Sequence, residues 1–263
     1  MKKKLLCLCA LFAVLVSCLF PATVVYGSEY VPWTHEEESV TYTRVEEEEY
    51  MLDRGFPCYG RFDTLLSDAC GPIAATNILV YLDRYYPNIV PDHQGYMTDT
   101  GYAYMWYDVE DLISDLATRM KLAEGGVSLI NFKRGLGAYL KETGYTFGYR
   151  DVVADGKFYY NYYAEYIDAG YPVALFFSKV NEIDWTDNGN VRTFSKKWRS
   201  VNHVMAAFGY RTAKFYRTVN GVETLVRSDT YLLVSNGYGS NNYVIVDDTL
   251  TLDEGFAVRM HEI

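Results

Sequence analysis

The segment Ser67-Asp68-Ala69-Cys70-Gly71-Pro72 places a thiol where an amphipathic helix is expected to begin. Free backbone N–H groups and the helix dipole stabilise an anion at such a position, so they favour a thiolate at Cys70. The same N–H groups can hold the negative oxygen of a tetrahedral intermediate, and Gly71 leaves room for a substrate carbonyl. A cysteine that begins a helix is more often a buried small hydrophobe, so a second group must support the chemistry.

That second group is His203, a polar residue at the start of an apolar strand. It is the candidate general base that would take the proton of Cys70. The other histidines have weaker surroundings, because His35 lies in an acidic stretch, His93 in a polar loop and His261 at the C-terminus. The alternative for His203 is a half-buried imidazole that is bonded to a backbone carbonyl.

Five short segments follow one another along the chain: Cys70-Gly71-Pro72, Ala74-Ala75-Thr76-Asn77, Gly170-Tyr171-Pro172-Val173, Asn202-His203-Val204 and Phe208-Gly209-Tyr210. In that order they resemble the papain-like cysteine peptidases of the bacterial C39-like group, over Cys70 to about Val246. The resemblance implies an α+β papain-like fold, with a helical lobe that carries the cysteine and an antiparallel β-sheet lobe that carries the histidine. It also implies hydrolysis of peptide bonds through a thioester acyl-enzyme, without a metal ion or an organic cofactor.

Asn236-Gly237-Tyr238-Gly239 follows a later strand and is similar to the Asn-Ser-Trp-Gly motif of papain. This similarity implies that Asn236 is the third catalytic residue, which orients His203, and that the tyrosine ring could shield the bond between them. Two alternatives stay open. The segment could be an ordinary turn at the end of a strand, or Asp247 or Asp248 could orient the histidine, as an aspartate does in many C39-like enzymes.

One position departs from the family pattern. Papain-like enzymes carry a glutamine about six residues before the cysteine as a side-chain oxyanion donor, whereas Thr64 occupies that position here. No glutamine lies between Met51 and Cys70. Thr64, Ser67 or a backbone N–H would have to supply the second donor.

Hydrophobic periodicity predicts helices first and short antiparallel strands second, which is an α+β arrangement. Asn220-Gly221 predicts a hairpin, because both residues accept positive φ. The segment Asp184 to Asn190 is expected to form a hairpin turn rather than a calcium loop. The expected helices are 70–86, 107–121, 128–143 with Ser128 as its cap, and 157–169; the expected strands are 172–180, 201–210, 215–219, 222–226, 231–235 and 243–246.

The N-terminus predicts export. Residues 1–27 combine lysines with a long apolar run and are typical of a signal peptide, and Cys18 lies in a segment that resembles a lipoprotein cleavage site. We therefore expect a secreted or extracytoplasmic bacterial protein, with a lipid anchor at Cys18 as one alternative and no stable membrane span after cleavage. Residues 28–50 are acidic and predict a solvated leader or short pro-segment with one short strand, so that residues 51–263 form the peptidase domain.

The net charge of −10 argues against nucleic acid as a partner, and the resemblance to cysteine peptidases implies a peptide or protein substrate. A disulfide between Cys58 and Cys70 is the alternative to a reactive thiol. Two other functions stay open. A transacylase or transpeptidase would use the same Cys–His pair, and a catalytically silent surface protein could bind partners through tyrosines 159, 160, 162, 163 and 166.

Overall fold

A nine-stranded antiparallel sheet dominates the part of the chain that the computed structural model describes, which comprises residues 25–26, 32–53, 55–90, 96–98, 101–103 and 106–262. The main path of the sheet runs β2-β11-β10-β14-β13-β12-β3, and β15 joins it beside β10 and carries β7. The strands are β2 (Thr34–Thr41), β3 (Arg44–Met51), β7 (Tyr145–Asp151), β10 (Val173–Asn188), β11 (Val191–Arg199), β12 (His203–Val219), β13 (Val222–Ser235), β14 (Asn241–Ile245) and β15 (Thr251–Glu262).

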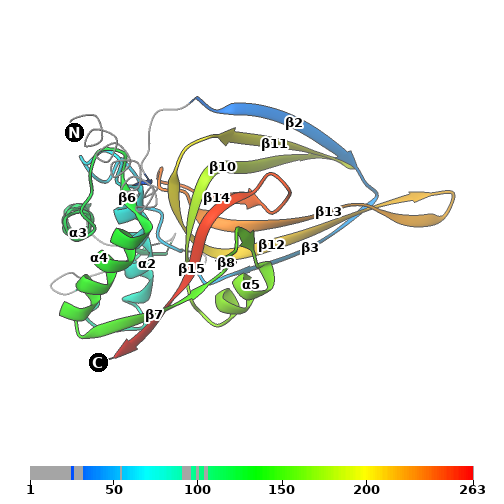
Figure 1. Cartoon of the computed structure of the whole chain (residues 1–263). Helices are drawn as coiled ribbons and strands as arrows, with labels where there is room; N and C mark the ends of the chain where they lie inside the picture. The colour runs from blue at the N-terminus through cyan, green and yellow to red at the C-terminus, as the bar shows by residue number, and fades with distance from the viewer. Residues whose placement is uncertain are drawn as a thin grey trace, which may run out of the picture.

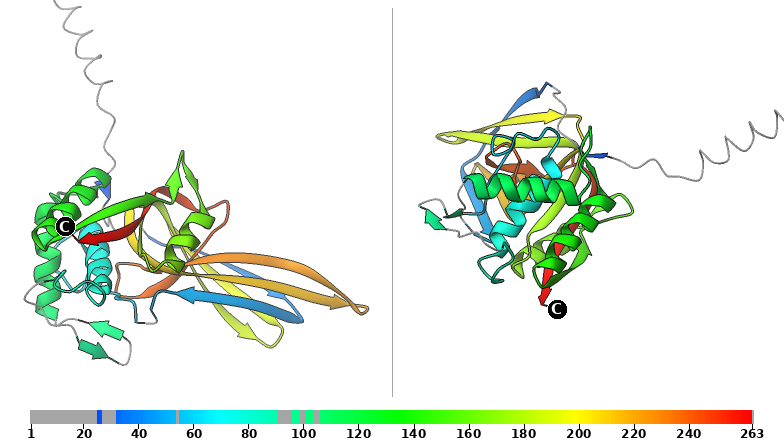
Figure 2. Two further views of the ribbon diagram at one scale, coloured as in Figure 1. Left: turned by 90° about the horizontal axis from the view of Figure 1, so that it is seen from below. Right: turned by 90° about the vertical axis from the view of Figure 1, so that its left-hand side faces the viewer.

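Three of the described helices gather at one end of the sheet, and the long strands run away from them (Figure 1). A hairpin of β12 and β13 extends beyond the rest of the molecule (Figure 2). The helices at the sheet end are α2 (Cys70–Leu82), α3 (Trp106–Arg119) and α4 (Leu129–Glu142), whereas α5 (Tyr160–Asp168) lies apart from them; short ladders pair β1 (Val25–Tyr26) with β6 (Val127–Ser128), β4 (Tyr96–Thr98) with β5 (Gly101–Ala103), and β8 (Val153–Ala154) with β9 (Lys157–Phe158).

Helix α2 is buried along its whole length, because its sequence is apolar on every face. It packs against β12 and α3. Asn77, one of its two buried polar side chains other than the cysteine, accepts the N–H of Tyr59 at 2.9 Å and donates to Ser235 Oγ at 3.1 Å. These contacts on several sides hold Cys70, the first residue of the helix, in a defined place.

The expected α+β papain-like fold is wrong. Strands account for 49% of the described residues and helices for 23%, so the described part of the protein is mostly antiparallel β-sheet. The expected helices do form, with Ser128 accepting the N–H of Asn131 as the cap of α4. The difference lies in the strands, which are much longer than the local patterns predicted: β10, β12 and β13 have 16, 17 and 14 residues.

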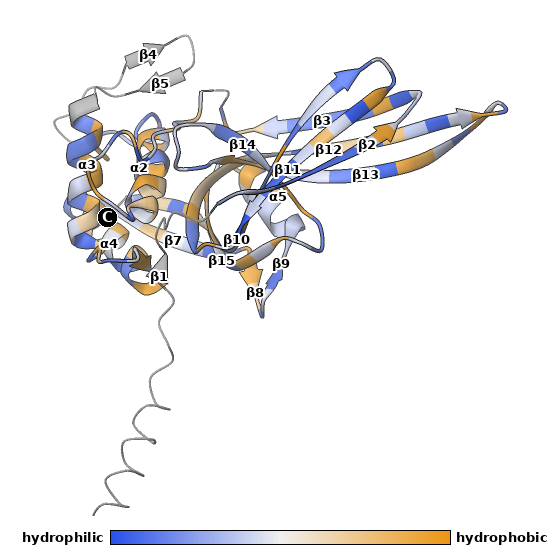
Figure 3. Cartoon of the chain, turned by 90° about the horizontal axis from the view of Figure 1, so that it is seen from above, coloured by the Kyte–Doolittle hydropathy of each residue, from blue (hydrophilic) through white to orange (hydrophobic). Residues whose placement is uncertain are grey.

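The acidic segment 28–50 differs from the expected solvated leader. Its described residues form β2 and β3, which pair with β11 and β12, and the expected boundary at Met51 falls inside β3. Arginines of the sheet neutralise the glutamates, and Glu47 forms ion pairs with both Arg192 and Arg211. Figure 3 shows the resulting hydrophilic stretches on β3. Because no local pattern reveals these distant arginines, the glutamate run resembled a solvated segment.

The two expected turns form. Asn220 and Gly221 have φ values of 52° and 77° and connect β12 to β13, and a turn at Gly189 connects β10 to β11. The predicted signal peptide and Cys18 lie outside the described residues, except that Val25–Tyr26 pairs with Val127–Ser128. Within the described ranges, no helix has the length and apolar character needed to cross a membrane.

Candidate active site

Cys70 and His203 line the same cavity, which has a volume of about 260 Å³. The cavity lies between the loop that precedes α2, the first residue of β12 and the turn that follows β13. Thr64 and Ser67 also line it, together with Tyr238. The fold thus brings together the two residues that the sequence singled out for nucleophilic chemistry, although most of the chain separates them.

Sheet register places the histidine. His203 is directly opposite Phe177 of β10, and β12 runs antiparallel to β13, with Ala206 opposite Ser235. The turn at residues 236–240 therefore lies beside the start of β12. A hydrogen bond from the backbone N–H of Val204, the next residue of β12, to the Cys70 thiol lowers the pKa of that thiol, although burial raises it more.

Gly71 allows close packing of the helix and also leaves space in the site. A Cβ at this position would lie 2.3 Å from Cγ2 of Val127, which is too close for any real contact. The sequence suggested that Gly71 leaves room for a substrate carbonyl. In the structure, its missing side chain also allows the first turn of α2 to approach Val127.

His203 has one bonded and one free ring nitrogen. Its Nε2 lies 2.8 Å from the backbone oxygen of Asn236, and because a carbonyl only accepts, Nε2 carries the proton. Nδ1 then bears the lone pair, and it has no hydrogen-bond partner although the residue is only 1% exposed. A buried, unprotonated and unpartnered nitrogen at a cavity that also contains a thiol is suited to accept a proton.

Tyr238 stacks on the imidazole, with ring centroids 5.2 Å apart and an angle of 13° between the planes. Gly237 favours this turn, because its φ of 74° lies in the left-handed region, where a side chain would be strained. The expected aromatic cover of the histidine is therefore present. It keeps the imidazole in a fixed plane and limits the access of water to it.

Asn236 contacts His203 through its backbone rather than its side chain, which differs from the expected role. The side-chain Oδ1 accepts the N–H groups of Tyr238 and Ser240 at 2.9 and 3.3 Å, and Nδ2 donates to Glu182 Oε1 at 3.1 Å. Asn242 donates to the other oxygen of Glu182 at 2.7 Å. The side chain of Asn236 thus holds the turn whose carbonyl orients the histidine.

The sequence analysis missed Glu182. This carboxylate is buried in β10, and burial raises its pKa, while hydrogen bonds from Asn236 and Asn242 act in the opposite direction. Nothing in the local sequence distinguishes it from the acidic residues that follow in the same strand. Only the pairing of β10 with its neighbours reveals that its side chain supports the turn beside His203.

Burial keeps the Cys–His pair neutral. It raises the pKa of Cys70 from 9.0 to about 12 and lowers the pKa of His203 from 6.5 to about 4. The expected thiolate at the helix N-terminus is therefore not the resting form. Backbone N–H groups lower the pKa of the thiol, but its burial, which leaves Cys70 only 3% exposed, raises that pKa more.

Thr64 and Ser67 both lie at the cavity, so either hydroxyl is placed to contribute to an oxyanion site. No side chain caps the N-terminus of α2, which leaves backbone N–H groups of its first turn without a side-chain acceptor. Asp247, the alternative partner for the histidine, instead accepts hydrogen bonds from Thr249 and pairs with Lys196 at 3.1 Å. Asp248 is exposed.

The two cysteines do not form a disulfide. Both are free thiols, with Cys58 exposed and Cys70 buried. A search of the described residues for clusters of three or more metal-ligating side chains gives none. The tyrosine cluster is divided, because Tyr163 is fully buried and donates to the Gly209 carbonyl at 2.6 Å, whereas Tyr159 and Tyr162 are exposed and stacked.

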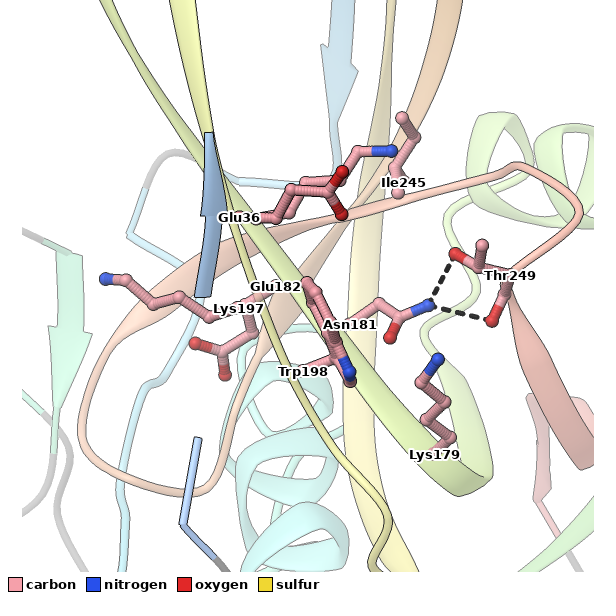
Figure 4. A pocket seen from close by; sticks show the side chains of 9 residues that line it. Glu36, Lys179, Asn181, Glu182, Lys197, Trp198, Ile245 and Thr249 are labelled. Atoms are coloured by element: carbon pink, nitrogen blue, oxygen red, sulfur yellow. Dashed lines mark hydrogen bonds between the residues drawn. The ribbon is translucent and has the colours of Figure 1, made fainter. Parts of the chain in front are cut away.

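A second cavity, of about 90 Å³, lies beside β10 and β11 (Figure 4). Lys179 and Trp198 line it, and Asn181 donates to both oxygens of Thr249 at 2.8 Å. Neither a cysteine nor a histidine is among its lining residues. The candidate nucleophile and base therefore both lie at the first cavity and not at the second.

No family model, no curated protein and no solved structure matches this chain.

Proposed function

We propose that this protein is a cysteine-dependent hydrolase that cleaves peptide bonds, acting outside the cytosol after export. One observation carries the proposal: Cys70 shares a cavity with His203, whose Nδ1 is buried, unprotonated and without a partner. A purely structural histidine would be expected to use both ring nitrogens or to expose one to water. The proposal rests on this site and not on a papain-like fold.

In the first half of the reaction, Nδ1 of His203 takes the proton of the Cys70 thiol as the sulfur attacks the substrate carbonyl carbon. The carbonyl oxygen becomes negative, and backbone N–H groups at the start of α2, with a hydroxyl of Thr64 or Ser67, stabilise it. The imidazolium then gives its proton to the leaving amine. The C–N bond breaks, and a thioester to Cys70 remains.

In the second half, Nδ1 takes a proton from water as the water oxygen attacks the thioester. The C–S bond breaks, the acid is released, and the thiol regains its proton from the imidazolium. The carbonyl of Asn236 holds the Nε2 proton throughout, so the ring presents the same nitrogen in both halves. An amine in place of water would make the protein a transacylase, with the same residues.

Alkylation by iodoacetamide tests the nucleophile without knowledge of the substrate. We expect Cys70 to react faster than Cys58 in the mature protein, although Cys58 is the exposed thiol, because His203 supplies a base to Cys70 alone. His203→Ala should abolish this advantage. Mass mapping of each labelled cysteine gives the two rates, and an unreactive Cys70 would favour a surface protein that binds partners without catalysis.

A further inference from the structure

We propose that the site selects acyl substrates that carry a carboxylate next to the scissile bond, that Arg61 binds this group, and that the buried Arg199 adds its charge nearby. The inference rests on the proposed hydrolase activity and adds the class of substrate. It follows from two guanidinium groups that surround the tyrosine of the active site.

Arg61 is an exposed residue that lines the cavity. Its Cζ lies 4.8 Å from the centroid of the Phe62 ring and 5.5 Å from that of Tyr238. These aromatic contacts hold the side chain at the cavity. Among the described residues no carboxylate forms an ion pair with Arg61, so its charge is available to a ligand.

Arg199 is a buried cation beside the same tyrosine. It is only 6% exposed, and its Cζ lies 4.6 Å from the centroids of both Trp33 and Tyr238. Its Nε and Nη2 have no hydrogen-bond partner. Arg199 does not itself line the cavity, so its charge acts on a ligand there through the electrostatic field and not by contact.

Two carboxylates lie near these arginines. Asp68 lines the cavity, where its charge raises the pKa of Cys70, and its Oδ2 accepts the N–H of Gly125 at 3.1 Å. Both oxygens of Glu182 accept hydrogen bonds from asparagines, and Glu182 raises the pKa of Arg199, although burial lowers that pKa more. The chain as a whole carries −10, so the unpaired Arg61 is a local positive charge at the cavity that can attract an anionic group.

Two alkylating agents test the inference, because iodoacetate and iodoacetamide differ only in the carboxylate. The variant Cys58→Ser leaves one thiol in the mature protein, and N-acetylcysteine amide is the reference thiol. We expect the rate ratio of iodoacetate to iodoacetamide to be about tenfold higher at Cys70 than in the reference, because a nearby positive charge attracts the carboxylate of iodoacetate. High salt should reduce the excess.

Arg61→Glu should lower this ratio to the reference value or below it, and Arg199→Gln should lower it where thermal unfolding shows that the variant folds. Arg134→Ala is the matched control, since Arg134 is an exposed arginine on α4. A ratio at Cys70 equal to the reference, or one that Arg61→Glu leaves unchanged, overturns the inference while the hydrolase proposal stands. A thiol that reacts with neither agent overturns both.

Peptide substrates give a second measurement. In fluorogenic peptides that differ only by Glu or Gln beside the cleaved bond, the Glu peptide should have about a tenfold higher kcat/KM, and Arg61→Glu should remove or invert the difference. Equal cleavage of both peptides contradicts the inference. Cleavage of neither, with Cys70 also unreactive, contradicts the proposed function.

Discussion

The Nε2 atom of His203 donates to the backbone oxygen of Asn236 over 2.8 Å, while the side chain of Asn236 points its amide toward Glu182. A backbone carbonyl therefore orients the imidazole, and the side chains around it act by holding that carbonyl in place. The side chain of Asn236 therefore acts on the histidine only indirectly, through the position of its own backbone carbonyl. This arrangement determines how substitutions near the site should behave.

The Cys–His pair should act as one unit. Cys70→Ala, His203→Ala and the double variant should each lose activity by at least about a thousandfold and reach nearly the same residual rate, because removal of either member abolishes the same step. Hydrolysis of a fluorogenic peptide mixture measures these rates. Full activity of Cys70→Ala would disprove the mechanism, and additive losses would show that His203 acts elsewhere.

Glu182 should affect catalysis because it fixes the position of the turn that carries the Asn236 carbonyl. Glu182→Ala removes the acceptor of Asn236 Nδ2, so we expect a loss of about tenfold in kcat, with a smaller change in KM, because the histidine and not the substrate is displaced. Asn236→Ala should show a similar loss, since the carbonyl remains. Asn242→Ala is the control, because it removes only the other contact of Glu182. Steady-state kinetics on correctly folded variants distinguish the two explanations. A general loss of stability would leave the kcat of the folded enzyme unchanged, whereas loss of an orienting contact lowers it.

Stability should decrease on both sides of neutral pH. Burial lowers the pKa of His203 to about 4 from 6.5, so between these values the unfolded chain binds a proton that the folded chain does not. Stability is then fully present above about pH 6.5 and falls by about 3 kcal/mol as pH drops to about 4. Urea unfolding of the wild type and of His203→Asn measures this difference, and an identical pH dependence in both would refute it.

Titration of Cys70 should lower the stability at high pH. Burial raises the pKa of its thiol to about 12 from 9.0, so above pH 9 the unfolded chain releases a proton that the folded chain retains. Stability should fall as pH rises from about 9 toward 12. Cys70→Ala should show a weaker dependence than Cys58→Ser in the same urea titrations, and buried tyrosines such as Tyr163, whose pKa burial also raises, account for the part that remains. An equal dependence in the two variants would contradict the assignment.

The acidic strands should be needed for stability. Arg192 is 4% exposed and pairs with Glu47 of β3 and with Asp187. Arg192→Ala removes the ion-pair partner of Asp187 and one of the two partners of Glu47, and it should lower the free energy of unfolding by about 3 kcal/mol. Lys157→Ala, at an exposed position, is the control. Limited proteolysis that trims residues 32–51 without a change in Tm would contradict the integration of β2 and β3 into the sheet.

Local sequence determined the candidate nucleophile, the candidate base and many of the elements that carry them. Cys70 could be placed at a helix start and His203 at a strand start, because helix periodicity and apolar runs are properties of neighbouring residues. The turn at Asn220-Gly221 followed from positive φ at two adjacent positions. In each case the information lies within a few residues.

Tertiary structure alone decided the rest, because the deciding contacts join residues that are far apart in the chain. Pairing with β11 and β12 turned an acidic run into two strands, and it changed the expected α+β fold into a mostly β one. The orientation of Glu182 depends on the neighbours of β10. The protonation of Cys70 and His203 depends on burial, which is a property of the whole packed core and outweighs the local helix N-terminus.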